Sequence, residues 1–359
     1  MPQPNVQNVH IDAILTNISV AYLQNTDNFI ADKVFPVIPV DKKSNLYFKY
    51  TKDDWFRDEA QRRADGTVSA GSGYGLTTDT FMADVWAFHK DIGDQTRANS
   101  DNPLNPDMEA TQFITQRLLL RREVQWASDY FQAGVWALGV NGQPATGSTA
   151  AVNAGTAVWQ WDDYVGATGT SSYTNGGTYY SNPIADVELA KAAILQTTGY
   201  EPNTLVLGYR VFQVLKNHPL LVDRYKFTQA GAIVTEDLLA QLFGVDRVLV
   251  AKAVVNTANE TASDLLGVGV ASSNYKFTVG NNALLAYTAP NPGLMTPSAG
   301  YTFMWTGVSG GLGTTVGVSR FRMEELKADR VEGEIAFDNK VVAADLGYFF
   351  SNIIGGTAI

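Results

Sequence analysis

The strongest constraint on the fold is a long helix that the sequence predicts in its first half. The run Asn105-Pro106-Asp107-Met108-Glu109 is a strong helix start, because Asn caps the first turn, Pro fits the first helical position, and acids favour the positive end of the helix dipole. Apolar residues then recur at three-to-four spacing as far as Phe131–Ala133, just before Gly134. A helix of about 28 residues spans about 40 Å, which is long for a globular protein.

A two-stranded ribbon is predicted before this helix. Its limbs are Leu46–Phe56 and Leu76–Ile92, and a polar, glycine-rich tip, Gln61–Gly75, joins them. Such a ribbon is barely stable by itself. The stretch Asp41–Asp65 also mixes charges of both signs with aromatic residues, which favours docking on a neighbouring molecule. The alternative is a solvated hairpin.

A second segment, Ala31–Val40, is predicted to be an extended arm on an apolar surface. Pro36 and Pro39 exclude a regular helix and disfavour a central strand. We expect neither arm nor ribbon to bury its apolar residues within one subunit, so the chain should be an obligate oligomer. The candidate contacts between subunits, with the two aromatic residues as apolar anchors, are Trp55, Phe56, Arg57, Asp58, Glu59, Arg62 and Arg63.

The second half of the chain predicts an α/β unit followed by strands. Gly139–Ser181 is rich in Gly, Ala, Thr and Ser and is interpreted as a surface loop with one short strand, Val158–Val165. Strands and helices then alternate, which is typical of a compact α/β unit. The helices are expected at Ile184–Thr198, at Tyr209–Asn217 and from the Thr235 cap to Phe243, and the strands at Thr204–Gly208, Arg247–Val255, Val316–Met323 and Val331–Val342.

The composition excludes several classes of protein. The 359 residues include no Cys, which excludes disulfides and thiolate metal sites, and no apolar run is long enough to span a membrane. Residues 1–5 do not resemble a signal peptide, so synthesis in the cytosol is expected. The formal charge of −10 argues against a free-standing nucleic-acid binder. A container could still enclose DNA, and its inner surface is then expected to be neutral to acidic.

No standard catalytic or ligand-binding motif is complete. Gly307-Val308-Ser309-Gly310-Gly311 has the spacing of a hydrolase nucleophile elbow, but too many glycines follow it for a helix, and no His follows it. His10, His89 and His218 stand far apart, which favours packing roles. Cations on the long helix could meet phosphate, but ion pairs with Asp or Glu are the simpler explanation for Arg117, Arg121 and Arg122. We therefore expect no enzyme activity and no catalytic, cofactor-binding or metal-binding residues.

The order of arm, charged ribbon, long helix, α/β unit and late strands resembles one known family. The stretches that carry the resemblance are Ala31–Val40, Ile92–Asn99 leading into Asn102–Pro106, Arg121–Glu123, Trp161–Tyr164, Ser181–Ile184, Gly199–Val206, Asn217–Pro219 and Glu236–Val245. Together they are similar to the major capsid proteins of tailed bacteriophages, whose fold is shared with encapsulins. The segment Gly166–Tyr180 departs from the family pattern as an apparent insertion.

The resemblance implies an α+β fold of the phage major capsid, Hong Kong 97 type. The implied parts are an N-terminal arm (1–45), an extended E-loop (46–92), a P-domain with a spine helix (93–138), a Gly/Thr/Ala-rich loop insertion (139–180), an axial A-domain (181–313) and return strands of the P-domain (314–359).

The implied function is a capsid subunit that assembles as hexamers and pentamers into an icosahedral head around double-stranded DNA, which it does not bind by sequence. The implied partners are other copies of the chain, a portal protein and, in some heads, a decoration protein. Because the arm motif begins at Ala31, a scaffolding protein would be a separate chain. Assembly would take place in the host cytoplasm and the product would be the virion. Two alternatives stay open: an encapsulin-like nanocompartment, and an unrelated β-rich enzyme or adhesin.

Overall fold

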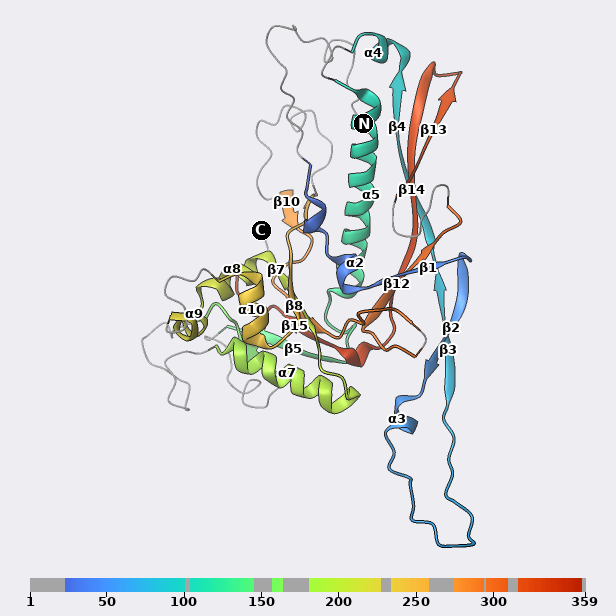
Figure 1. The fold of residues 1–359 in the computed structure, drawn as a ribbon. Coiled ribbons are helices and arrows are strands. Elements are labelled where there is room, and N and C mark those ends of the chain that lie inside the picture. The colour runs from blue at the N-terminus through green and yellow to red at the C-terminus, as the bar shows by residue number, and fades with distance from the viewer. Residues whose placement is uncertain are drawn as a thin grey trace.

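A computed structural model describes residues 23–100, 104–144, 157–163, 181–226, 234–257, 274–293, 295–308 and 316–356. Three parts are visible in Figure 1: a long helix beside a long sheet, a second sheet surrounded by shorter helices, and a thin ribbon that projects away from both. None of the helices in these ranges is long and apolar enough to cross a membrane.

The long helix is α5, Pro106–Tyr130, and it follows the short helix α4, Asp94–Ala98. Its predicted start is confirmed, because the side chain of Asn105 accepts the N–H of Met108 at 3.2 Å. The helix ends slightly before the predicted Phe131–Ala133. Gly134, expected to stop it, has a positive φ of 89°, a conformation that glycine adopts without strain.

A five-stranded sheet lies beside α5 (Figure 1). Its strands are β1 (Val37–Val40), β4 (Asp84–Gly93), β12 (Gly300–Trp305), β13 (Gly317–Met323) and β14 (Ala328–Val341). The central strand is β14, which pairs with β4 on one side and with β12 and β13 on the other. Ile114 and Leu118 of α5 are buried against Val331 and Ile335 of β14. Gly333 permits this close approach, because a Cβ there would lie 2.4 Å from Ile114 Cγ2.

The predicted α/β unit is confirmed around a six-stranded sheet. The strand order is β6 (Ala157–Trp159), β5 (Leu138–Gln143), β15 (Gly347–Ser351), β11 (Ala283–Ala286), β7 (Thr204–Gly208), β8 (Arg247–Ala251). The helices are α7 (Pro183–Thr198), α8 (Tyr209–Asn217), α9 (Pro219–Lys226) and α10 (Glu236–Phe243), and a 3-10 turn η4 (Ala344–Leu346) precedes β15. Every residue of β7 is buried, as expected for a central strand.

Two predictions in this part of the chain are wrong. The stretch from Gly139 was expected to be a loop, but Leu138–Gln143 is a strand that pairs in parallel with β15. The strand expected over Arg247–Val255 is divided, because β8 ends at Ala251 and β9, Val254–Asn256, pairs with β10, Tyr275–Phe277, in a separate sheet. Both errors concern pairing with distant segments. Most of the predicted loop and the inserted segment 166–180 lie outside the described residues.

The extended arm was expected not to bury its apolar residues within one subunit, but it packs on its own subunit, which corrects that expectation. It contains a 3-10 turn η1 (Thr26–Asn28), a helical turn α2 (Ala31–Val34) and β1, an edge strand paired in parallel with β12. Phe35 is fully buried, and its ring lies 5.9 Å from that of Trp126 and 6.4 Å from that of Trp136. Residues 29–35 therefore bury their large apolar side chains inside one chain and give no argument for oligomerisation.

The predicted ribbon is present but shorter than expected. Its strands are β2 (Ser44–Tyr50) and β3 (Leu76–Met82), which are antiparallel, with Ser44 opposite Met82 and Tyr50 opposite Leu76. The limb expected to continue to Ile92 divides at the buried Ala83, after which β4 joins β14 instead. Beyond β2 the chain forms a helical turn, α3 (Lys52–Trp55), instead of the expected strand.

Candidate functional site

The ribbon exposes one apolar face along its whole length. Because side chains alternate between the faces of a strand, Leu46, Phe48 and Tyr50 share one face, with Leu76 opposite Tyr50. Their exposed fractions are 56%, 63%, 40% and 49%. Large apolar side chains gathered on one exposed surface are typical of an interaction site. The alternation of these residues is visible in the sequence, but they were not among the candidate contacts.

A cluster of three aromatic rings stands where the ribbon strands end. The rings of Trp55 and Tyr74 are 5.5 Å apart, and Tyr50 lies 6.3 Å from Trp55 and 5.9 Å from Tyr74. Trp55 nevertheless remains 53% exposed and Tyr74 62%. Phe56, 60% exposed, lies beside Gly199 at the end of α7. The two predicted apolar anchors are therefore both largely exposed.

The opposite face of the ribbon makes contacts within the chain. The ring of Tyr47 lies 5.4 Å from that of Phe303 of β12, and Lys49 Nζ lies 2.8 Å from Asp79 Oδ2. The hydrogen bond from Lys49 lowers the pKa of Asp79 to about 2. Lys52 also forms an ion pair with Asp345, beside β15. These contacts orient the ribbon, so its apolar face projects as part of a defined surface.

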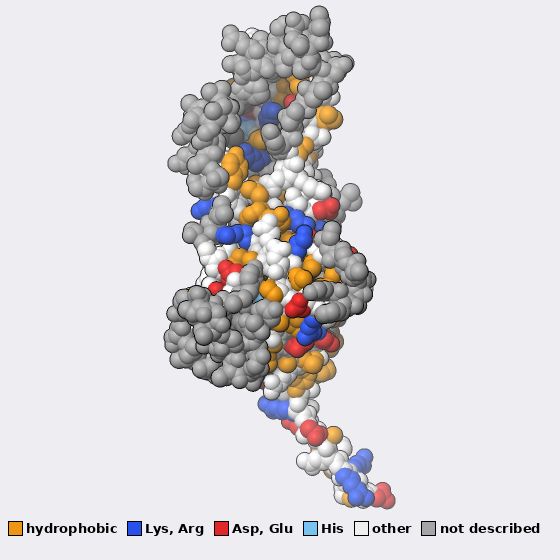
Figure 2. Space-filling model, turned by 90° about the vertical axis from the view of Figure 1, so that its left-hand side faces the viewer, with side chains coloured by type: hydrophobic (Ala, Val, Ile, Leu, Met, Phe, Trp, Pro, Cys, Tyr) orange, Lys and Arg blue, Asp and Glu red, His pale blue; other side chains and the backbone are white. Residues whose placement is uncertain are grey.

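The charged candidate contacts lie together near the tip of the ribbon. Arg57 lies 3.7 Å from Asp54 and 3.8 Å from Glu59, so it has partners in its own ribbon. Arg62 and Arg63 are exposed, and Arg63 Nε donates to the carbonyl of Thr67 at 2.6 Å. Figure 2 shows the ribbon as a narrow projection with cationic and acidic side chains at its tip. Asp58 is also exposed there.

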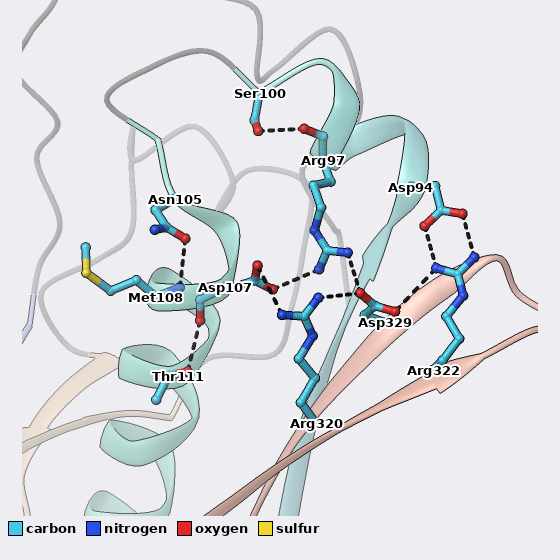
Figure 3. Close-up of polar contacts among 10 residues, drawn as sticks. All are labelled: Asp94, Arg97, Ser100, Asn105, Asp107, Met108, Thr111, Arg320, Arg322 and Asp329. Carbon is cyan, nitrogen blue, oxygen red and sulfur yellow. Dashed lines mark hydrogen bonds and ion pairs between the residues drawn. The ribbon is translucent and has the colours of Figure 1, made fainter.

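A second polar cluster joins three elements at the far end of the long sheet (Figure 3). Asp329 of β14 lies at its centre and accepts hydrogen bonds from Arg97 and, at 2.5 and 3.3 Å, from Arg320 and Arg322. Arg322 also binds both carboxylate oxygens of Asp94, at 2.5 and 2.6 Å. Asp107 of α5 completes the cluster, 2.8 Å from Arg97 and 3.5 Å from Arg320. Three cations and three anions thus hold α4, α5 and the β13–β14 hairpin together.

This cluster predicts a dependence of stability on pH. The surrounding guanidinium groups, first Arg320, hold the pKa of Asp329 well below its usual range. The ionised form is therefore favoured in the folded state, and its contribution to stability is present above about pH 4 and is lost at lower pH. We expect Asp329→Asn to lower the unfolding temperature at pH 7, and this difference should shrink steadily as the pH falls below about 4. Asp58→Asn, at the exposed ribbon tip, is the matched control, and equal effects of the two changes on calorimetric unfolding would contradict the prediction.

His218 is packed inside the structure beside a serine. His218 is fully buried, and its Nε2 lies 3.1 Å from Ser181 Oγ. Because Nδ1 accepts the N–H of Leu220 at 3.2 Å, the ring proton is on Nε2, and the ring cannot act as a base toward the serine. The Gly-x-Ser-x-Gly stretch lies mostly outside the described residues. Among the described ranges, no group of three or more Asp, Glu or His side chains could hold a metal ion.

Comparison with solved structures identifies the fold. A phage-related protein from Bordetella bronchiseptica RB50 superposes with a TM-score of 0.62 at 20% identity, covering 92% of this chain and 94% of that chain. The capsid of cyanophage P-SCSP1u gives 0.56 at 11% identity, covering 98% and 95%. An encapsulin from Synechococcus elongatus gives 0.50 at 10% identity, covering 100% and 99%. The class is therefore the α+β, Hong Kong 97-type shell fold of phage capsids and encapsulins.

Two relatives within this class are phage capsid proteins. The major capsid protein of Burkholderia phage BcepMu is 25% identical over 345 residues, which cover 96% of this chain and 97% of that protein. The major capsid protein of Pseudomonas phage JBD67 is 26% identical over 261 residues, 69% of this chain and 70% of that protein. No family model matches the chain. The chain is thus similar over nearly its whole length to a phage major capsid protein, and this similarity supports the role of a structural, self-assembling component of a virion.

Proposed function

We propose that this chain assembles as hexamers and pentamers into the icosahedral head that encloses the double-stranded DNA of a tailed phage. The observation that carries the proposal is the exposed apolar face of the ribbon, Leu46, Phe48, Tyr50 and Leu76, which no other part of its own chain covers within the described residues. An apolar surface of this kind is stabilised when a second copy covers it.

The parts of the fold correspond to the parts of a shell subunit in this proposal. The ribbon acts as the E-loop, α5 and the five-stranded sheet form the P-domain, and the six-stranded sheet with α7–α10 forms the A-domain. In this proposal the N-terminal arm is the part of residues 1–45 before Thr26, since Ile30–Phe35 pack on α5 and Val37–Val40 pair with β12. The candidate contacts at the ribbon tip, with Trp55 and Phe56 as anchors, are proposed to meet a neighbouring subunit.

Further partners belong to the same proposal. The head would be built in the host cytoplasm around a portal protein, with a separate scaffolding protein and, in some heads, a decoration protein. The subunit itself would catalyse no reaction. DNA would be enclosed without recognition of its sequence, because a net charge of −10 opposes tight binding of a polyanion.

Sedimentation tests the proposal directly. We expect the purified chain at micromolar concentration to form large closed shells, visible by negative-stain microscopy, in equilibrium with capsomers. Particles recovered from infected cells should contain DNA and carry tails. A stable monomer at these concentrations would contradict self-assembly. Shells filled with a protein cargo and free of tails would instead support the encapsulin-like alternative, which the fold alone also permits.

A further inference from the structure

Three cations form a row where the long helix meets the edge of the sheet. Arg117 and Arg121 stand one turn apart on α5, and Lys90 stands on the neighbouring strand β4. Each lies over an aromatic ring. Lys90 Nζ is 5.9 Å and Arg117 Cζ 5.1 Å from the ring centre of Phe113, and Arg121 Cζ is 4.1 Å from that of Trp86. Stacking on an aromatic face holds a cation in place without neutralising it.

The sequence led us to expect that the helix arginines pair with acids, and among the described residues this is correct for only one of the three. Arg122 lies 3.2 Å from Asp32 and is buried. Across the described ranges, Lys90, Arg117 and Arg121 form no ion pair. Within the described part of the chain, the one hydrogen bond that Arg121 donates goes to the neutral side chain of Gln125, at 2.6 Å. The positive charge of the row is therefore not compensated by a neighbouring carboxylate within the described part of the chain.

The sheet separates this row from two acids of β14. In the antiparallel register of β4 and β14, Lys90 stands opposite Val331, and Trp86 opposite Ile335, on the face that packs against α5. Glu332 and Glu334 alternate with these residues and so lie on the other face of the sheet. Both carboxylates are therefore separated from the row by the sheet, and Asp329, on the same face as the row, is paired with Arg97, Arg320 and Arg322.

We propose that the cation row Lys90, Arg117 and Arg121 contacts phosphates of the enclosed double-stranded DNA. Guanidinium groups bind phosphate through paired hydrogen bonds, and such contacts read no sequence. The inference rests on the proposed function. It also specifies how the subunit is oriented in the shell: the α5 face of the P-domain is directed toward the DNA, and the face that carries Glu332 is directed away from it. Three phosphate contacts in each subunit are far fewer than a continuous basic lining of the shell would make. The DNA is therefore positioned without being held tightly.

A binding measurement tests the row without requiring a shell. A labelled 30-base-pair duplex of random sequence is titrated with the full chain, kept below its assembly concentration, at several salt concentrations. Each phosphate contact contributes about −0.9 to the slope of log affinity against log salt, so the row should supply a slope of about −2.7. We expect Lys90→Gln/Arg117→Gln/Arg121→Gln to remove most of this slope and to weaken binding at low salt at least tenfold, whereas Arg117→Lys/Arg121→Lys should retain the slope.

The control is Arg62→Gln/Arg63→Gln, which removes exposed cations at the ribbon tip and should leave duplex binding unchanged. Equal binding by the triple variant and the natural chain would overturn the proposal, as would an equal loss in the control. If the triple variant instead reduced self-association without DNA and left duplex binding unchanged, the row would contact an acidic surface of another copy, which also overturns the proposal. Failure of the chain to form shells would affect only the proposed function, because the duplex measurement uses unassembled protein.

Discussion

Replacing Trp55 with alanine is expected to prevent shell assembly at every salt concentration while leaving the subunit folded. Trp55 is 53% exposed, so its loss removes little buried surface from the subunit beyond the ring contacts with Tyr50 and Tyr74. In an interface, truncation of a buried aromatic anchor costs about 2 kcal/mol or more. The same contact recurs in every subunit of a shell, so a modest loss for each contact becomes a large loss for the assembly. Light scattering during assembly and circular dichroism of the subunit measure the two effects separately.

Two controls make this prediction specific to the ribbon. Leu189→Ala removes an apolar side chain that is 69% exposed on α7 and should leave assembly unchanged. Arg62→Ala/Arg63→Ala should slow assembly at low salt only, because exposed ion pairs contribute about 0–1 kcal/mol each and are screened by salt. Normal assembly of the Trp55→Ala variant, or equal failure of the Leu189→Ala variant, would show that the aromatic cluster is not an anchor.

Glu123→Gln is expected to abolish part of the pH dependence of subunit stability. Glu123 of α5 is 1% exposed, and its Oε2 accepts the N–H groups of Ile30 and Ala31 at 3.0 and 2.9 Å. Burial is the largest influence and raises the pKa of Glu123 to about 7, and the nearby Asp32 also raises it. The two hydrogen bonds and the nearby Arg122 act in the opposite direction but do not outweigh burial. The folded state therefore binds a proton more tightly than the unfolded state. This contribution to stability is complete below about pH 4 and is lost as the pH rises to about 7.

The size of the effect follows from the shift in pKa. A change from 4.5 to about 7 corresponds to about 3 kcal/mol between pH 4 and pH 8. Urea unfolding of the unassembled subunit should show the natural chain losing stability relative to the Glu123→Gln variant over this range. Asp186, whose pKa burial also raises to about 7, titrates in both proteins and cancels in the comparison. Parallel stability curves for the two proteins would contradict the prediction. Asp186→Asn should remove the remaining change near pH 7.

Local signals in the sequence determined the helices of this protein. The Asn105 cap of α5, the Asn182 cap of α7 and the Thr235 cap of α10 each accept a backbone N–H three residues later, as the sequence predicted for α5 and α10. Gly199 ends α7 in the left-handed conformation that glycine adopts without strain. These interactions join residues within a few positions of each other, so they can be recognised without knowledge of the rest of the fold.

Pairing between distant strands was decided only by the tertiary structure. The sequence predicted two apolar limbs for the ribbon, but it could not show that β4 leaves β3 at Ala83 to pair with β14, about 245 positions later. The apolar run at Ala31–Val40 could have been covered either by a neighbouring subunit or by helix α5 of the same chain, and the sequence is compatible with both. Hydrophobic burial has no direction along the chain, so an apolar pattern shows that a face is covered but not by which segment.

For the candidate site too, some features could be predicted from the sequence and others became visible only in the structure. The ordered set of motifs indicated the similarity to phage major capsid proteins, and the charged aromatic ribbon was recognisable as the assembly candidate from its sequence alone. The face of the ribbon that is exposed, the ion cluster around Asp329 and the cation row of Lys90, Arg117 and Arg121 depend on strand register and on helix packing. Ion pairs and cation–aromatic contacts act over a few ångströms, and the residues that form these sites are up to about 230 positions apart in the chain. Only the folded backbone brings them within that distance.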